Sequence, residues 1–271
     1  MSELNLEQSQ HQTMNDPAVV ALFYRFKSED NTVYVNPTDV AHEVNAFRLN
    51  LSKGLVTVQM KVDCSTEQSA RAQVEPFLKA WETSAALSEG RKVITFEFQR
   101  SKIVDRSPDP AGQTKLRPLA GILSATGSLV GCLQVSKTHY PEPPKDFVMC
   151  PDVETMWRRY SGYQEGREPL SSMAYLCLTI LEMNAGDRRR SALQYGFDHT
   201  VLSKLGYLCS EVGDEQTARK RSNQSQNRSY TPAEKSWMEA VIRAMIRRVG
   251  EFTHDPTRAF KPLTMSDFPP L

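Results

Sequence analysis

The sequence lacks the cysteine pattern of a secreted or metal-binding protein. Its five cysteines, Cys64, Cys132, Cys150, Cys177 and Cys209, are far apart and contain no C-x-x-C pair. A disulfide framework needs an even, closely spaced set, and a structural zinc site needs clustered ligands. The cysteine usage therefore excludes both classes and indicates a reducing compartment.

Long apolar runs are also missing. The longest, around residues 173–181, has about half of the roughly 20 residues that a membrane span needs. The N-terminal stretch MSELNLEQSQHQTMND lacks the basic start and apolar core of a signal peptide. We therefore expect a soluble, cytoplasmic protein with no membrane partner, and a disordered tail over residues 1–16.

Sequence motifs of catalysis are scarce. The chain contains no G-x-S-x-G, no P-loop and no G-x-G-x-x-G motif. The five histidines, His11, His42, His139, His199 and His254, are scattered and form no H-x-x-x-H pair. The sequence thus predicts no metal and no cofactor, and favours a non-enzymatic protein.

The chain as a whole has no large excess of one charge, but part of its second half does. The formal net charge is +1, with 39% hydrophobic and 24% charged residues, which is typical of globular domains. Residues 216–248, however, contain eight Lys and Arg against two Glu, a local charge of +6. Such a concentration is typical of proteins that bind nucleic acid, although it is equally compatible with a solvated surface.

The first half alternates between strand and helix patterns. Residues 43–51 and 55–62 flank a Gly-containing loop and predict a hairpin, and the second run alternates apolar with polar residues. An apolar stripe over 70–85 predicts a helix that begins near Glu75, because Pro76 fits a first turn, and that ends at Gly90. Further strands are expected at 93–98 and in a second hairpin, 116–125 and 128–136.

From residue 151 onward the pattern is helical. Short helices are expected at 188–195 and 199–209, and Thr231-Pro232-Ala233-Glu234 is a capping box that starts a last helix ending near Gly250. The fold class is α+β: a mostly antiparallel sheet with one packed helix over residues 17–140, then an all-α bundle over 151–252. A Pro-rich linker (141–150) and a C-terminal tail (253–271) complete the expected organisation.

Residues 188–205, RRRSALQYGFDHTVLSKL, resemble the helix-turn-helix motif of DNA-binding proteins. Ala192 is the small residue where the helices would cross, and Gly196 makes the turn. Phe197, Leu202 and Leu205 occupy positions that the second helix must bury. The alternative is an ordinary αα-hairpin that closes a helical bundle.

The resemblance implies a set of nucleic-acid-binding residues. Exposed positions of the second helix would face the major groove, and the three arginines before it would contact phosphates. Basic residues of the loop that follows would extend the surface. The expected set is Arg188, Arg189, Arg190, His199, Thr200, Ser203, Lys204, Arg219, Lys220 and Arg221.

A second resemblance lies near the C-terminus. Arg247, six residues and His254 resemble the R-x(4–6)-H signature of HEPN-type ribonucleases. That resemblance would make the histidine the residue acting in RNA cleavage and the arginine the phosphate ligand. Gly250, Pro256 and Pro262 depart from it, because they predict that no helix follows.

These observations predict an accessory or regulatory protein of bacterial type. Its helical domain would bind DNA or RNA, with duplex DNA favoured, and its α+β domain would contact a protein partner or a second copy. The alternatives are a HEPN-type ribonuclease and a structural subunit whose basic face contacts another protein.

Overall fold

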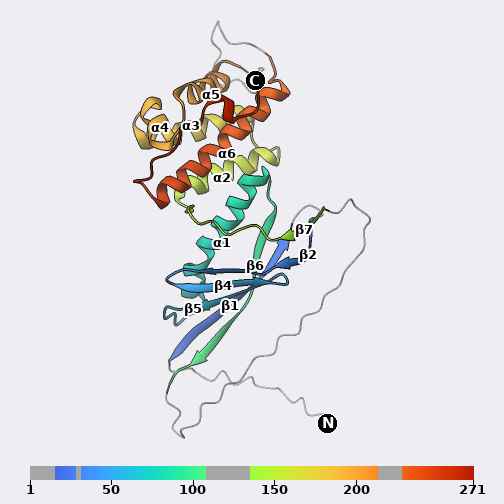
Figure 1. The fold of residues 1–271 in the computed structure, drawn as a ribbon. Helices are drawn as coiled ribbons and strands as arrows, with labels where there is room; N and C mark the ends of the chain where they lie inside the picture. The colour runs from blue at the N-terminus through green and yellow to red at the C-terminus, as the bar shows by residue number, and fades with distance from the viewer. Residues whose placement is uncertain (1–15, 29–31, 108–134, 213–227) are drawn as a thin grey trace, which may run out of the picture. The chain divides into compact units, whose positions relative to one another are not determined.

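The computed structural model describes residues 16–28, 32–107, 135–212 and 228–271 (Figure 1). It confirms the α+β class, with a five-stranded antiparallel sheet and a helix followed by several helices. The described residues form two compact units that interleave in sequence. The sheet unit comprises 16–27, 32–75, 96–107 and 135–140, and the helical unit comprises 28, 76–95, 141–212 and 228–271. The expected 17–140 domain did not include this interleaving.

The sheet unit contains seven strands among the described residues. Five of them form one sheet in the order β3 (Val40–Glu43), β4 (Phe47–Ser52), β5 (Leu55–Met60), β1 (Pro17–Ser28) and β6 (Ile94–Asp105). The remaining two, β2 (Thr32–Thr38) and β7 (Val135–His139), pair in parallel. The predicted hairpin at 116–136 falls outside the described residues, apart from 135 and 136, which belong to β7.

The β4–β5 hairpin is confirmed, with one difference. Leu49 pairs with Val58 and Leu51 with Val56, and all four side chains are buried because alternate residues point to the same face. The expected strand over 43–51 is instead two strands. Val44 N donates to Phe47 O at 3.0 Å, which closes a turn between β3 and β4.

Helix α1 (Glu67–Glu89) begins eight residues earlier than the sequence predicted. Its start is fixed by Thr66, whose Oγ1 accepts a hydrogen bond from Ser69 N at 3.1 Å. Pro76 therefore lies inside the helix, where it removes one i→i−4 hydrogen bond. One boundary between the two units falls at this residue. The second segment of the sheet unit ends at Glu75, and the next segment of the helical unit begins at Pro76.

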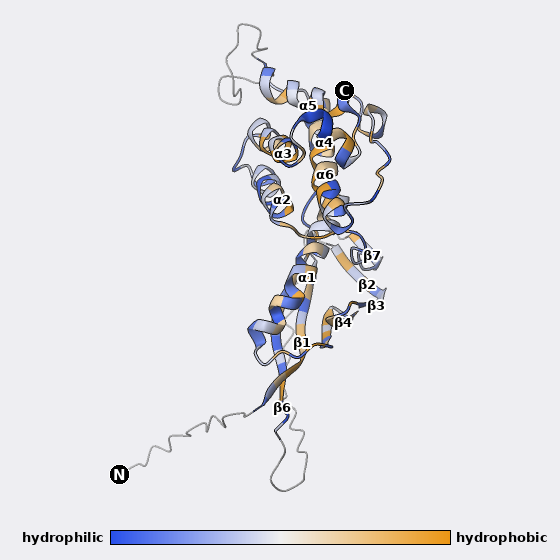
Figure 2. Cartoon of the chain, turned by 90° about the vertical axis from the view of Figure 1, so that its left-hand side faces the viewer, coloured by the Kyte–Doolittle hydropathy of each residue, from blue (hydrophilic) through white to orange (hydrophobic). Residues whose placement is uncertain are grey.

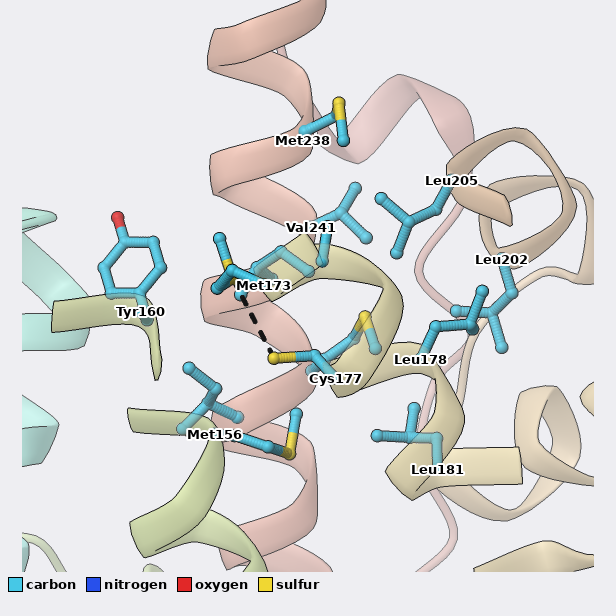
Figure 3. Packing of buried hydrophobic residues seen from close by; sticks show 14 of the residues in the cluster. Met156, Tyr160, Met173, Cys177, Leu178, Leu181, Leu202, Leu205, Met238 and Val241 are labelled. Atoms are coloured by element: carbon cyan, nitrogen blue, oxygen red, sulfur yellow. Dashed lines mark hydrogen bonds between the residues drawn. The ribbon is translucent and has the colours of Figure 1, made fainter. Parts of the chain in front are cut away.

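Among the residues beyond 150 that the structure describes, the helical unit contains five α-helices and a short 3₁₀ turn. They are α2 (Pro151–Gln164), α3 (Leu170–Ala185), α4 (Arg188–Tyr195), α5 (His199–Glu211), α6 (Pro232–His254) and η1 (Met265–Asp267). Helix α3 packs against α2, α4, α5 and α6. Figure 3 shows Leu178 and Leu181 of α3 beside Leu202 of α5. Each fully buried leucine contributes about 1.5–3 kcal/mol to folding.

Helix α6 ends later than predicted, and the tail is not free. The helix continues through Gly250 to His254. Phe147 packs so closely there that a Cβ at position 250 would lie 2.3 Å from its ring, which accounts for a glycine inside the helix. Pro256 disfavours helix at the residue before it, and the helix C-cap is Asp255. The expected linker packs as well, since Val148 N donates to Gly250 O at 3.2 Å.

Candidate nucleic-acid interface

Helices α4 and α5 and the turn between them have well-defined local causes. Asp187 caps α4 by accepting a hydrogen bond from Arg190 N at 2.8 Å, and Asp198 caps α5 by accepting from Thr200 N at 2.7 Å. Gly196 ends α4 with φ +64°, a left-handed conformation that glycine adopts without strain. The two helices and their glycine turn lie where the sequence predicted them.

The charged form of the Asp198 cap is favoured by its hydrogen bonds. Hydrogen bonds from the hydroxyl and the backbone N–H of Thr200 hold the pKa of this carboxyl below its ordinary value of 3.8. A charged cap places an acceptor where the first turn of α5 has unpaired N–H groups. The start of α5 is therefore fixed by its own sequence.

Helix α5 has one buried and one accessible face. The buried face carries apolar residues at i, i+1, i+4, i+7 and i+8 and packs into the core. Its members are Val201, Leu202, Leu205, Leu208 and Cys209. The accessible face carries polar residues and one aromatic residue. Its members, which we call the α5 face, are His199, Thr200, Ser203, Lys204 and Tyr207.

Local contacts organise the α5 face. Ser203 Oγ lies 3.3 Å from His199 Nδ1, and Lys204 Nζ lies 5.2 Å from the centre of the Tyr207 ring. Tyr207 is 42% exposed, so its ring is accessible on this face. Sequence reasoning missed Tyr207, although its spacing from Ser203 and Lys204 places it on the same side of the helix.

The three arginines that start α4 have different environments. Arg188 Nε donates to Glu182 Oε1 at 2.6 Å, and its guanidinium packs against the backbone of Gly206 in α5. Arg190 is exposed and lies 3.5 Å from Asp187. Arg189 is exposed and makes no ion pair with any residue that the structure describes. Figure 2 shows the strongly hydrophilic colour of α4 that these residues produce.

The residues after α6 lie along the α4–α5 turn. Leu263 N donates to Gly196 O at 2.9 Å, and Asp198 N donates to Leu263 O at 2.8 Å. Phe260 packs on Gly196 from the same side. Sequence reasoning treated these residues as a tail, because two prolines and the absence of periodicity carry no signal for such a contact.

The other predicted residues lie elsewhere or outside the described residues. Arg219, Lys220 and Arg221 fall in 213–227, which the structure does not describe. Arg247 donates to Ser88 Oγ at 2.9 Å, and His254 is exposed at the end of α6. These two are seven residues apart on one helix, about 10 Å along its axis.

Among the residues that the structure describes, no group of three or more His, Cys, Asp or Glu side chains is placed to hold a metal ion. No described helix combines the length and apolar character needed to cross a membrane.

Comparison of the chain with protein-family models, with curated protein sequences and with solved structures finds no match. The function is therefore argued from the geometry of the helical unit alone.

Proposed function

We propose that the helical unit binds duplex nucleic acid, with duplex DNA as the favoured ligand, through the α5 face and the exposed arginines of α4. The observation that carries the proposal is the division of α5 into two faces. Its apolar side is buried in the core, whereas its first residues, His199 and Thr200, are exposed. In helix-turn-helix proteins the N-terminal residues of the second helix contact base edges.

The dimensions and chemistry of α5 support a duplex. A helix of 13 residues is about 20 Å long, and a major groove about 12 Å wide admits one helix. Hydroxyl and imidazole groups hydrogen-bond to base edges, and Lys204 supplies a cation for phosphate. These side chains come from consecutive turns of a single helix.

Charge around α5 supports phosphate contacts from α4. Arg189 and Arg190 are both exposed, and the Arg190 side chain is 72% exposed even with Asp187 nearby. Each neutralised phosphate contributes about 0.9 to the slope of log K against log salt concentration. Arg188 is not part of this set, because its guanidinium is bonded to Glu182.

Fluorescence anisotropy with a labelled random-sequence duplex tests the proposal. The full chain should bind, and its affinity should fall steeply between about 50 and 200 mM salt. The double variant R189A/R190A should bind more weakly, with a salt slope reduced by up to about 2. R158A/R167A removes the same charge from exposed positions of α2 and the α2–α3 connection and should leave both quantities unchanged.

Two results would contradict the proposal. The first is the absence of any complex with duplex DNA at about 50 mM salt. The second is an equal loss of binding in R189A/R190A and R158A/R167A, which would show that only the net charge of the chain matters and not the position of the arginines. A chain that binds only an acidic protein, with no duplex competing, would instead favour the structural-subunit alternative.

A further inference from the structure

The residues that follow α6 contact the same turn that begins the α5 face. We call residues 258–268 the C-terminal segment. Its Leu263 forms a parallel β-bridge with Phe197, using both backbone hydrogen bonds with Gly196 and Asp198 described above. These bonds engage the last residues before α5. The segment therefore supports the turn that leads into α5, whose first residue is set by the Asp198 cap.

The segment is anchored on both sides of this bridge. The Arg248 guanidinium stacks on the Phe260 ring at 4.6 Å from its centre, and its NH2 donates to Lys261 O at 3.2 Å. Farther along, the Phe268 ring meets Trp237 of α6 at 6.2 Å between ring centres. Aromatic and cation–π contacts of this kind contribute about 0.5–1.5 kcal/mol each. The segment is thus held by α6 while it bonds to the turn.

Lys261 is carried to the turn by these contacts. Its carbonyl oxygen would lie 3.4 Å from a Cβ at Gly196, and its side chain is exposed. It makes no ion pair with any described residue. Its charge also acts on Asp267, whose pKa is lowered by hydrogen bonds from Thr264 and, less strongly, by Lys261. The Lys261 backbone therefore lies beside the turn that leads into α5, and its side chain is exposed there.

We infer that Lys261 is a further phosphate-binding residue of the proposed interface, and that the C-terminal segment positions it beside the α4–α5 turn. The inference rests on the proposed function and adds a contact from a part of the chain about 60 residues away in sequence. The ligand group is a backbone phosphate, because a lone ammonium on a flexible stem binds phosphate as a point charge.

The test compares K261A, K261R and K145A in the same anisotropy titrations. K261A should weaken duplex binding and reduce the salt slope by about 1, since one phosphate contact is lost. K261R should restore the slope, because the charge is kept. K145A removes an exposed lysine of the helical unit at another position and should leave the slope unchanged. Urea unfolding should give the same stability for all three variants and the parent chain.

The outcomes separate the inference from the proposed function. If the parent chain binds duplex with a steep salt dependence and K261A keeps the same slope, the inference alone is wrong. If K145A lowers the slope as much as K261A, the inference is also wrong, because the effect is not local. If the parent chain forms no salt-dependent complex, both fail.

Discussion

Arg188 Nε lies 2.6 Å from Glu182 Oε1, so the first arginine of α4 is joined to α3. The same guanidinium lies so close to α5 that a Cβ on Gly206 would be 2.6 Å from it. Both partners are about one-third exposed, which leaves the pair partly screened by water. Arg188 therefore links three helices and differs in role from the two arginines that follow it.

Replacing Arg188 by alanine should lower stability and leave the salt dependence of duplex binding intact. The loss of a charge-assisted hydrogen bond and of packing on Gly206 should cost about 1–2 kcal/mol in the free energy of unfolding. R189A, at an exposed position, should change stability by less than about 0.5 kcal/mol. Urea denaturation measures both values. Equal stability of R188A and R189A would refute the structural role of Arg188.

Gly196 should tolerate alanine poorly, because two costs act together there. Its φ of +64° is left-handed, and a Cβ would lie 2.2 Å from Phe260 Cβ. Gly166 is a matched control, since its φ is +71° and an added Cβ meets nothing within 4 Å. G166A should cost about 1 kcal/mol from backbone conformation alone. G196A should cost at least about 1–3 kcal/mol more, from the overpacking against Phe260.

Unfolding and hydrogen-exchange measurements on G196A and G166A test this explanation. Thermal or urea unfolding gives the stability of each, and hydrogen exchange reports the Asp198 amide that bonds to Leu263. In G196A that amide should exchange faster, whereas in G166A it should not. If both variants lose the same stability, Phe260 of the C-terminal segment does not pack closely against Gly196.

Local signals predicted local structure well. The capping box at Thr231 and Glu234 is present in the structure, with Glu234 N donating to Thr231 Oγ1 at 3.1 Å. The glycine turn at Gly196 lies where helical periodicity and a single glycine placed it. Each of these features depends on residues within four positions of one another, so a short stretch of sequence specifies it.

Features that depend on distant partners could not be predicted in this way. Gly250 is a typical helix end by sequence, but it lies inside α6, where its missing Cβ leaves room for Phe147. Likewise Leu263 pairs with the α4–α5 turn through backbone bonds that no periodicity encodes. The structural role of Arg188 depends on Glu182 and Gly206, and three consecutive arginines do not reveal which one is paired.

Glu234 should make stability depend on pH. Hydrogen bonds from Arg228, together with those from the Thr231 backbone and hydroxyl, lower its pKa from the ordinary value of 4.5 to about 2. Because the folded-state pKa is the lower one, the stabilisation is complete above about pH 4.5 and is lost as pH falls toward 2. The shift corresponds to about 3 kcal/mol at neutral pH.

Comparing E234Q with E165Q isolates this contribution. E234Q should lower the free energy of unfolding by about 2–3 kcal/mol at pH 7, and the difference from the parent chain should shrink between about pH 4.5 and 2. Glu165 forms an exposed ion pair with Arg167, so E165Q should cost less than about 1 kcal/mol. Urea titrations across this pH range measure both. A difference for E234Q that is constant with pH would be inconsistent with the depressed pKa.

Tyr207 should support duplex binding through Lys204 and not through its own hydroxyl. The Lys204 ammonium lies over the Tyr207 ring at 5.2 Å, a cation–π contact that limits where the ammonium can move. Y207A removes the ring, and we expect duplex affinity to fall about 2- to 5-fold, the equivalent of about 0.5–1 kcal/mol. Y207F keeps the ring and should bind as the parent chain does. Because Tyr207 is 42% exposed, neither variant should lower the melting temperature by more than a few degrees. If Y207A binds as tightly as the parent chain, Lys204 needs no support from the ring, whereas if Y207A and Y207F are weakened equally, the effect belongs to the hydroxyl.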